Sequence, residues 1–253
     1  MGQQARRRPT RCALLASRLA GLIILSPALL SAVAPSDSFD EDHLNQARWT
    51  RIGAGDNTRR VIGILAAREQ APHERCLGIG IDTRETKNDT VKVAGVRSIP
   101  KFALVNGTRI STVLQWLEQK NASYFKAQIL LSPYPVSGNP LLTPDWLGVA
   151  YVGVPPRENA RLVVETRVNQ QERTLYREGW PLVNRAGRPI SAQQIEIRFR
   201  SDGFDLLEND TVIFQSQARP PFREAYLYLL VTSHSNFPLR LVCFDDIEIR
   251  APP

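Results

Sequence analysis

The feature that most constrains the fold of this chain is a series of short apolar runs in which apolar and polar residues tend to alternate. Alternation with a period of two is typical of a β-strand with one buried face. Turn residues separate the runs, and eighteen prolines argue against long helices. The runs are 61–67, 76–81, 91–96, 102–105, 125–132, 147–153, 161–168, 194–200, 204–207, 212–215, 225–232 and 240–249. So many strands without intervening helices predict an all-β sandwich or barrel.

One segment departs from this pattern. In residues 111–119, Val113, Leu114 and Leu117 fall on one helical face, and Ser111 is a plausible N-cap. We expect a short helix in a loop here, with a strand as the alternative.

The first 34 residues have the outline of an export signal. Five arginines precede an apolar run at 19–34, which ends in Ala32-Val33-Ala34. Pro27 interrupts this run, and Pro35 would occupy the position after the cleavage site, where cleavage is disfavoured. The alternative is therefore an uncleaved anchor in which residues 12–34 span a membrane. We therefore expect a signal peptide or anchor at 1–34, a linker and lead-in at 35–48, and one domain at 49–253. The expected location is secreted, periplasmic or at the cell surface.

The charge of the folded part differs from that of the whole chain. The chain carries +7, but the five arginines of residues 1–34 are accompanied by no acid, which leaves +2 for the remainder. No stripe of basic residues interleaved with aromatics survives, so we expect no nucleic-acid partner.

Two cysteines remain beyond the leader, Cys76 and Cys243, because Cys12 belongs to the leader. An even pair in an oxidising compartment indicates one disulfide. Two buried free thiols are the alternative.

Several segments together resemble the concanavalin A-like lectin/glucanase superfamily. FDEDHLNQARW at 39–49, followed by VIGILAARE, looks like the opening of such domains. LGVAYVG resembles a middle strand, QIEIRFRSDGFDLLENDTVIFQ a curved hairpin, and VCFDDIEI at 242–249 the closing strand. The resemblance covers most of residues 39–250 and implies a two-sheet antiparallel jelly-roll β-sandwich. These motifs specify a fold better than an activity.

The closing strand carries two further expectations. Strict alternation places Cys243, Asp245, Ile247 and Ile249 on one face, so Asp245 is expected to be buried with the isoleucines. A buried carboxylate needs donors or a cation. The resemblance implies that Asp245 helps to hold a structural calcium; hydrogen bonding to a nearby loop is the alternative. It also implies that the last strand lies near the first ones, which would bring Cys243 to Cys76.

No catalytic pattern is evident. The Glu-x-Asp-x-x-Glu strand of glucanases of this fold is absent, and Glu196 lies in an ordinary alternating strand. His234 has neighbouring serines but no orienting acid or nucleophile elbow. We therefore assign no catalytic residue.

Aromatic side chains on the concave sheet of such a sandwich are suited to stacking against sugar rings. The candidates are Trp146, Trp180, Tyr226 and Tyr228. The expected function is an exported, non-catalytic module that binds a glycan or polysaccharide or another surface partner. The alternatives are a glycoside hydrolase or polysaccharide lyase of the same fold, and a structural envelope protein.

Overall fold

The computed structural model describes residues 36–55, 58–67, 73–86, 90–116, 125–152, 161–179, 192–234 and 236–252. All of them belong to one compact unit, Ala32–Pro253. Within these ranges no helix has the length and hydrophobicity needed to span a membrane. The predicted signal peptide or anchor lies outside the described residues and stays a prediction.

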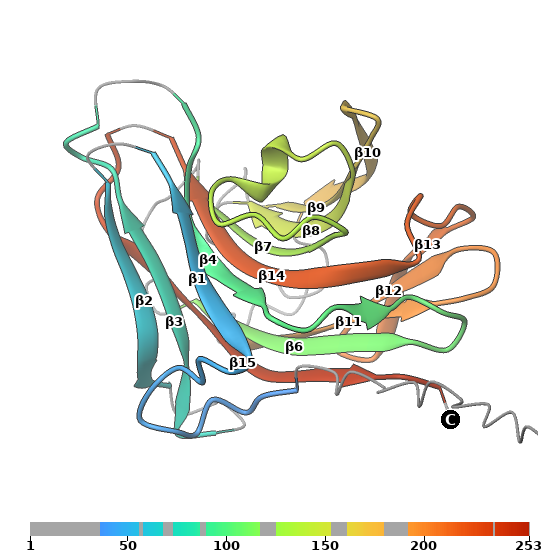
Figure 1. Cartoon of the computed structure of the whole chain (residues 1–253), viewed down its shortest axis with the longest axis horizontal. Helices are drawn as coiled ribbons and strands as arrows, with labels where there is room; N and C mark the ends of the chain where they lie inside the picture. Colours follow the sequence, from blue (N-terminus) through green and yellow to red (C-terminus); the bar gives the residue numbers. More distant parts are fainter. Residues whose placement is uncertain are drawn as a thin grey trace, which may run out of the picture. The chain divides into compact units, whose positions relative to one another are not determined.

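The described chain is built from two antiparallel sheets that stack on each other (Figure 1). The first has the strand order β1-β4-β14-β7-β8-β9-β10, and β5 also pairs with β14. It comprises β1 (Trp49–Ala54), β4 (Lys92–Ser98), β14 (Glu224–Ser233), β7 (Lys126–Ser132), β8 (Trp146–Val152), β9 (Arg161–Val168), β10 (Gln171–Gly179) and β5 (Phe102–Ala103). The second has the order β13-β12-β11-β6-β15-β3-β2. It comprises β13 (Thr211–Ser216), β12 (Phe204–Glu208), β11 (Ala192–Phe199), β6 (Arg109–Trp116), β15 (Arg240–Arg250), β3 (Arg75–Asp82) and β2 (Arg59–Ala66). The predicted all-β jelly-roll sandwich is confirmed.

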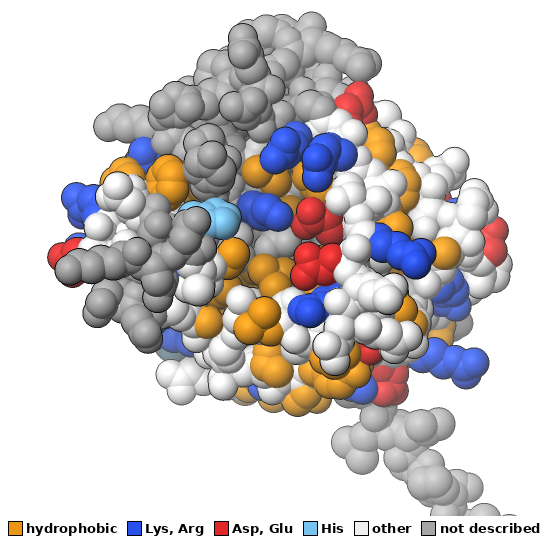
Figure 2. Space-filling model, turned by 90° about the horizontal axis from the view of Figure 1, so that it is seen from above, with side chains coloured by type: hydrophobic (Ala, Val, Ile, Leu, Met, Phe, Trp, Pro, Cys, Tyr) orange, Lys and Arg blue, Asp and Glu red, His pale blue; other side chains and the backbone are white. Residues whose placement is uncertain are grey.

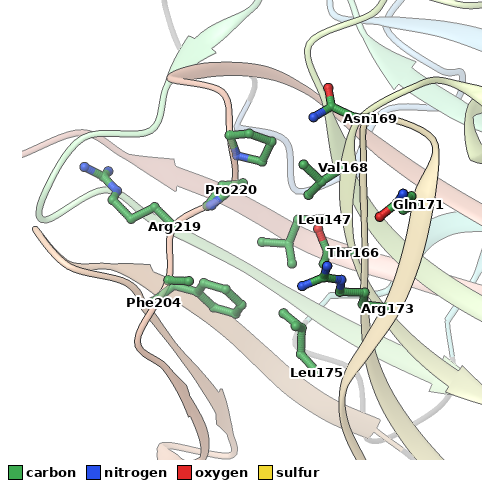
Figure 3. Close-up of a pocket in the computed structure, with 12 residues that line it drawn as sticks. Leu147, Thr166, Val168, Asn169, Gln171, Arg173, Leu175, Phe204, Arg219 and Pro220 are labelled. Carbon is green, nitrogen blue, oxygen red and sulfur yellow. The ribbon is translucent and has the colours of Figure 1, made fainter.

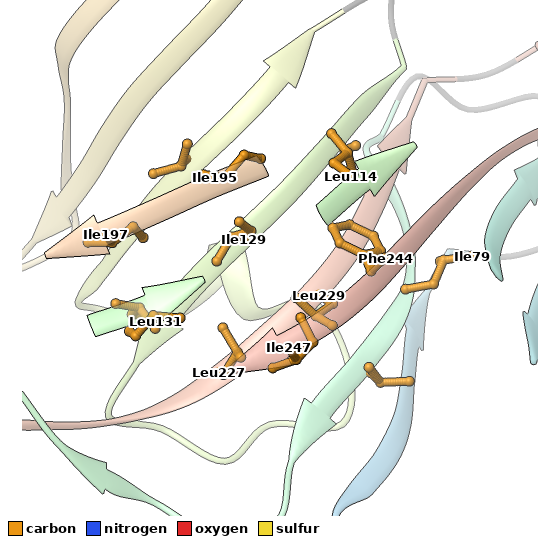
Figure 4. Close-up of a cluster of buried hydrophobic side chains, with 14 of the residues drawn as sticks. Ile79, Leu114, Ile129, Leu131, Ile195, Ile197, Leu227, Leu229, Phe244 and Ile247 are labelled. Atoms are coloured by element: carbon orange, nitrogen blue, oxygen red, sulfur yellow. The ribbon is translucent and has the colours of Figure 1, made fainter. Parts of the chain in front are cut away.

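The core lies between the two sheets and follows the alternation of the strands. In β14, Leu227 and Leu229 point into it, and in β11 Ile195 and Ile197 approach from the other sheet (Figure 4). Burial of these aliphatic and aromatic side chains supplies the main stabilisation of the sandwich.

The prediction of a helix at residues 111–119 is wrong, because residues 109–116 form strand β6. Ile110, Thr112 and Leu114 are buried while the residues between them are less so, which is a strand pattern. β6 lies between β11 and β15 and pairs with both. Backbone hydrogen bonds to two neighbours therefore outweigh the local helical spacing of three apolar residues.

A β-bulge in β15 overturns the alternation expected for the closing strand. Asp245 pairs with Val113 but Glu248 pairs with Ser111, so one extra residue is inserted, and Asp246 has a φ of 48°. Such a bulge reverses which side chains face inward. Phe244 and Ile247 consequently both point into the core (Figure 4). Asp245 is fully buried, as expected, but on the face of the sheet opposite to Ile247.

The lead-in at 35–48 is more than a linker. The backbones of Asp37 and Ile247 exchange two hydrogen bonds of 2.8 Å. Phe39 and Leu44 belong to the main core cluster. The side chain of Asp37 accepts a hydrogen bond of 2.9 Å from the indole nitrogen of Trp49. Residues from Asp37 onward are thus part of the packed domain.

Cys76 and Cys243 form a disulfide between the neighbouring strands β3 and β15, with a Cα–Cα distance of 5.5 Å. Leu77 and Phe244, the residues that follow them, face the core. The disulfide therefore lies on the outer face of the second sheet, where Asp245 also lies.

Candidate functional site

The outer face of the first sheet carries a second apolar cluster, which includes Trp146, Tyr228 and Leu230. It forms because every other residue of β14 points away from the main core. The connection between β7 and β8, residues 133–145, covers this cluster. The Tyr228 hydroxyl accepts a hydrogen bond of 3.0 Å from the Val136 amide and donates one to the Tyr134 carbonyl oxygen.

The covering connection has its own local order. It contains a single 3₁₀ turn, η1 (Pro140–Leu142), which begins after Asn139. The Asn139 side chain accepts a hydrogen bond of 3.0 Å from the Leu141 amide, and proline at the first position loses no hydrogen bond there. The Leu141 carbonyl oxygen in turn accepts a 3.1 Å hydrogen bond from the indole nitrogen of Trp146.

Beside this turn lies a pocket of about 530 Å³ on the outer face of the first sheet, here called the concave-face pocket. The first sheet curves upward at both ends around this face (Figure 1), and Figure 2 shows acidic and basic side chains close together on it. The side chains that matter most come from four strands and η1: Lys126, Gln128, Leu141, Trp146, Glu165 and Glu172.

The charged groups of the pocket take part in two ion pairs, one between β7 and β9 across β8 and one between the neighbouring strands β9 and β10. Lys126 Nζ lies 3.3 Å from Glu165 Oε2, and Arg167 Nη1 lies 3.9 Å from Glu172 Oε1. Arg167 also donates a 2.6 Å hydrogen bond to the Leu141 carbonyl oxygen, which ties the covering turn to the sheet. Each pocket carboxylate is therefore opposed by a cation.

Gln128 is the most unusual residue of the pocket. It lies on β7, lines the pocket and is 1% exposed. Its Oε1 atom is buried and accepts no hydrogen bond from any described residue. An unpaired buried acceptor costs about 1–3 kcal/mol. A ligand donor could remove this cost only if the Gln128 side chain turned toward the pocket, because the oxygen is itself buried.

The four predicted carbohydrate-binding residues lie in different surroundings. Trp146 lines the pocket, but it is only 2% exposed, and Tyr228 is buried below the covering connection. Tyr226 shares the face of Tyr228, as expected, and its ring lies under the Arg97 guanidinium at 5.2 Å. Trp180 lies outside the described residues. Sugar stacking on Tyr228 would require the covering connection to move, so this role stays a prediction.

The pocket acids were missed from the sequence, although a signal for them existed. In β9, Leu162 and Val164 belong to the core cluster, so Glu165 must point to the opposite face. Glu172 pairs with Arg167 across the β9–β10 hairpin and shares that face. Alternation therefore locates both acids, but only the sheet order shows that they border one pocket.

The residues considered for catalysis do not converge. Glu196, on β11 of the other sheet, forms an ion pair of 2.8 Å with Arg198. The backbone carbonyl oxygen of His234 accepts a 2.6 Å hydrogen bond from Thr83. Neither residue lines the concave-face pocket.

Asp245 is held mainly by hydrogen bonds. Its Oδ1 accepts one of 2.8 Å from the Asp246 amide and lies 3.2 Å from His73 Nδ1, while Oδ2 is buried without a partner in the described structure. Burial raises the pKa of Asp245, and the Asp246 amide and His73 partly offset that rise.

The side chains around Asp245 do not support the predicted calcium, which stays a prediction. Calcium prefers six to eight oxygen ligands, whereas the side chain nearest to this carboxylate is an imidazole. No group of three or more His, Cys, Asp or Glu side chains suited to a metal occurs within the described ranges.

A second buried carboxylate lies between the two sheets. Tyr151, on β8, donates a 2.7 Å hydrogen bond to Glu208 Oε1 on β12. Glu208 Oε2 is buried and finds no partner in the described residues. Burial raises the pKa of Glu208; the hydrogen bond from Tyr151 opposes this, and the charge of Glu178 adds to it.

The raised pKa of Glu208 predicts a pH dependence of stability. Between the ordinary pKa of a glutamate and the raised value, the folded state binds more protons than the unfolded state. The free energy of unfolding should therefore fall as pH rises from the ordinary pKa of a glutamate through the raised pKa of Glu208. Glu208→Gln should make this decline shallower in melting curves, whereas Glu224→Gln, at an exposed ion pair, should not. Identical slopes for wild type and Glu208→Gln would contradict the prediction.

Comparison with known proteins shows the fold of the chain. The catalytic domain of a laminarinase from Thermotoga petrophila RKU-1 matches with a TM-score of 0.56 and 12% identity, over 85% of this chain and 95% of that one. The globular domain of T. cruzi calreticulin matches with a TM-score of 0.57 and 12% identity, over 83% and 87%. A Bacillus licheniformis beta-glucanase matches with a TM-score of 0.53 and 8% identity, over 86% and 97%. No family model and no curated protein sequence matches. At these identities the likeness concerns the fold alone. The solved structures that share this fold include glycan-active proteins.

Proposed function

We propose that this chain, which has the concanavalin A-like jelly-roll fold, binds a carbohydrate in its concave-face pocket and does not cleave it. The observation that carries the proposal is a 530 Å³ pocket in which Lys126, Glu165 and Glu172 lie beside the apolar side chains of Leu141 and Trp146. Ligand pockets of this size combine apolar walls with a few polar groups that fix the ligand.

The chemistry of the pocket suits a polyhydroxylated ligand. Glu165 and Glu172 accept hydrogen bonds, Lys126 donates them, and Gln128 does both. Leu141 and Trp146 add an apolar wall against which the carbon face of a sugar ring can pack. Sugar hydroxyl groups both donate and accept, so each of these polar side chains would find a partner.

The ion pairs favour binding over hydrolysis. Hydrolysis by a carboxylate pair needs one acid that donates a proton to the leaving group. In this pocket each carboxylate instead contacts a cation, Glu165 with Lys126 and Glu172 with Arg167. A glycoside hydrolase remains the second candidate, because two carboxylates border one pocket and the laminarinase and beta-glucanase share the fold.

The disulfide supports export as part of this proposal. Disulfides persist in oxidising compartments and are rare in reducing ones. The Cys76–Cys243 bond is therefore consistent with a secreted, periplasmic or cell-surface protein.

The test is a binding measurement on a panel of soluble glycans that includes laminarin, paired with an assay for newly formed reducing ends. We expect binding without product. Glu165→Gln should weaken binding by about tenfold, because it removes a charged acceptor worth about 1–2 kcal/mol. Glu196→Gln is the matched control, since Glu196 is also a strand glutamate paired with a basic residue but lies on the other sheet.

The outcomes separate the candidates. Binding that is weakened by Glu165→Gln and unaffected by Glu196→Gln supports the proposal. Product formation that is lost in Glu165→Gln would establish the hydrolase. No binding to any glycan of the panel would reject both and leave a structural role.

A further inference from the structure

A second pocket, of about 370 Å³, opens between the two sheets (Figure 3). It is here called the inter-sheet pocket. Leu147 and Thr166 line it from β8 and β9, Arg173 and Leu175 from β10, and Phe204 from β12. Residues 218–221, which connect β13 to β14, close one side of it.

This pocket is distinct from the concave-face pocket. Arg173 pairs with Thr166 across the β9–β10 hairpin, whereas Glu172 pairs with Arg167. Successive residues of a strand point to opposite faces. Glu172 therefore borders the concave-face pocket, and Arg173, which is exposed, borders the inter-sheet pocket.

The floor of the inter-sheet pocket is apolar. Leu147 and Phe204 belong to the main core cluster, and their side chains point toward the gap between β8 and β12 (Figure 3). Leu175 is 38% exposed at its edge. Pro220 and Pro221 form a stiff wall, because each proline ring fixes its backbone φ. An aliphatic or aromatic group placed here would cover apolar surface that water now contacts.

Among the described residues, the charged groups that line the pocket are both positive: Arg173 and Arg219. The guanidinium of Arg219 already donates to the Leu104 carbonyl oxygen. Arg173 makes no ion pair with a described residue, and its side chain extends from β10 toward Thr166 and Leu147 (Figure 3). By contrast, Arg167 and Arg198 on nearby strands both contact carboxylates.

We propose that the inter-sheet pocket binds a small amphipathic organic anion. Its carboxylate would pair with the Arg173 guanidinium, whose planar fork matches a carboxylate. Its apolar part would lie against Leu147, Leu175 and Phe204. This site is independent of the carbohydrate proposal, because no residue lines both pockets.

The test uses octanoate as the anionic probe and octanol as its uncharged counterpart, both titrated calorimetrically into the whole protein. Octanoate should bind saturably, and Arg173→Gln should raise its dissociation constant by about threefold, since an ion pair at an exposed guanidinium is lost. The affinity for octanol should not change. Arg177→Gln is the matched control: Arg177 lies on the same strand but pairs with Val163, which faces away from the core.

Two results would overturn the proposal. One is equal octanoate affinity in wild type and Arg173→Gln, with both proteins showing the same melting temperature. The other is the absence of saturable octanoate binding by the wild type. Amide chemical shifts provide a second measurement: octanoate should shift Leu175 and Phe204, and shifts confined to Lys126 and Glu165 would contradict the assignment. Neither outcome depends on whether laminarin binds.

Discussion

A chain that ends at Leu239 is expected not to fold. The truncation removes β15, which lies inside the second sheet and pairs with β6 on one side and β3 on the other. It exposes both neighbours and removes four buried core side chains: Val242, Phe244, Ile247 and Ile249. The lead-in also loses its attachment, because Asp37 pairs with Ile247.

Circular dichroism and thermal unfolding measure this effect. The truncated chain should lack a cooperative transition, whereas a control chain that ends at Arg250 keeps every strand and should melt like the full protein. Phe244→Ala is a milder change to the same strand. It should lower the free energy of unfolding by about 3–5 kcal/mol, the range for removing a buried aromatic ring. A cooperative transition at the wild-type temperature in the chain ending at Leu239 would refute the arrangement of the second sheet.

Loss of the disulfide is expected to have the second-largest effect. Cys76 and Cys243 are 167 residues apart, so their bond closes most of the domain into one loop. On chain-entropy reasoning, a cross-link over a loop of this length contributes about 4–5 kcal/mol by restricting the unfolded state. The double variant Cys76→Ala/Cys243→Ala should therefore unfold at a much lower urea concentration than the oxidised protein.

The measurement is equilibrium urea unfolding of the oxidised wild type, the reduced wild type and the double variant. Reduced wild type and double variant should be destabilised to a similar extent, and reductant should leave the double variant unchanged. In denatured, unreduced protein, alkylation should label neither Cys76 nor Cys243. Labelling of both thiols, or equal stability of all three samples, would contradict the disulfide.

Most strands were predictable, because a buried sheet face imposes alternation on the sequence. The hairpin between β12 and β13 was also predictable, since Asn209 and Asp210 adopt the positive φ values, 48° and 63°, that such residues tolerate in tight turns. Strand β10 was not recognised. It is the edge strand of its sheet, and polar or charged residues make up most of it, so little apolar alternation marks it.

The errors share one physical origin. Residues 111–119 carry apolar spacing that suits a helix or a strand, and pairing of residues 109–116 with β11 and β15 decides for the strand. The bulge at Asp246 decides which side chains of β15 share a face with Asp245. The local sequence does not predict where this extra residue is inserted. Both features depend on neighbours that are distant along the chain.

The residues of the candidate sites, too, were only partly predictable from the sequence. The sequence placed Trp146 among the candidate ligand-binding residues, and Trp146 does line the concave-face pocket. It could not show that Gln128, Glu165 and Glu172 border the same pocket, because they lie on three different strands. Nor did it indicate that Tyr228 lies beneath residues 133–145.

By itself, the sequence determined that the chain is all-β, which segments form most of its strands, and which two cysteines beyond residue 34 are available to pair. These follow from local rules: alternation, turn chemistry and residue count. Only the tertiary structure decided the order of the strands, the bulge that turns Asp245 away from the core, and the two pockets. A pocket is a property of side chains brought together across sheets, and the contacts that form it have no counterpart in the spacing of residues along the chain.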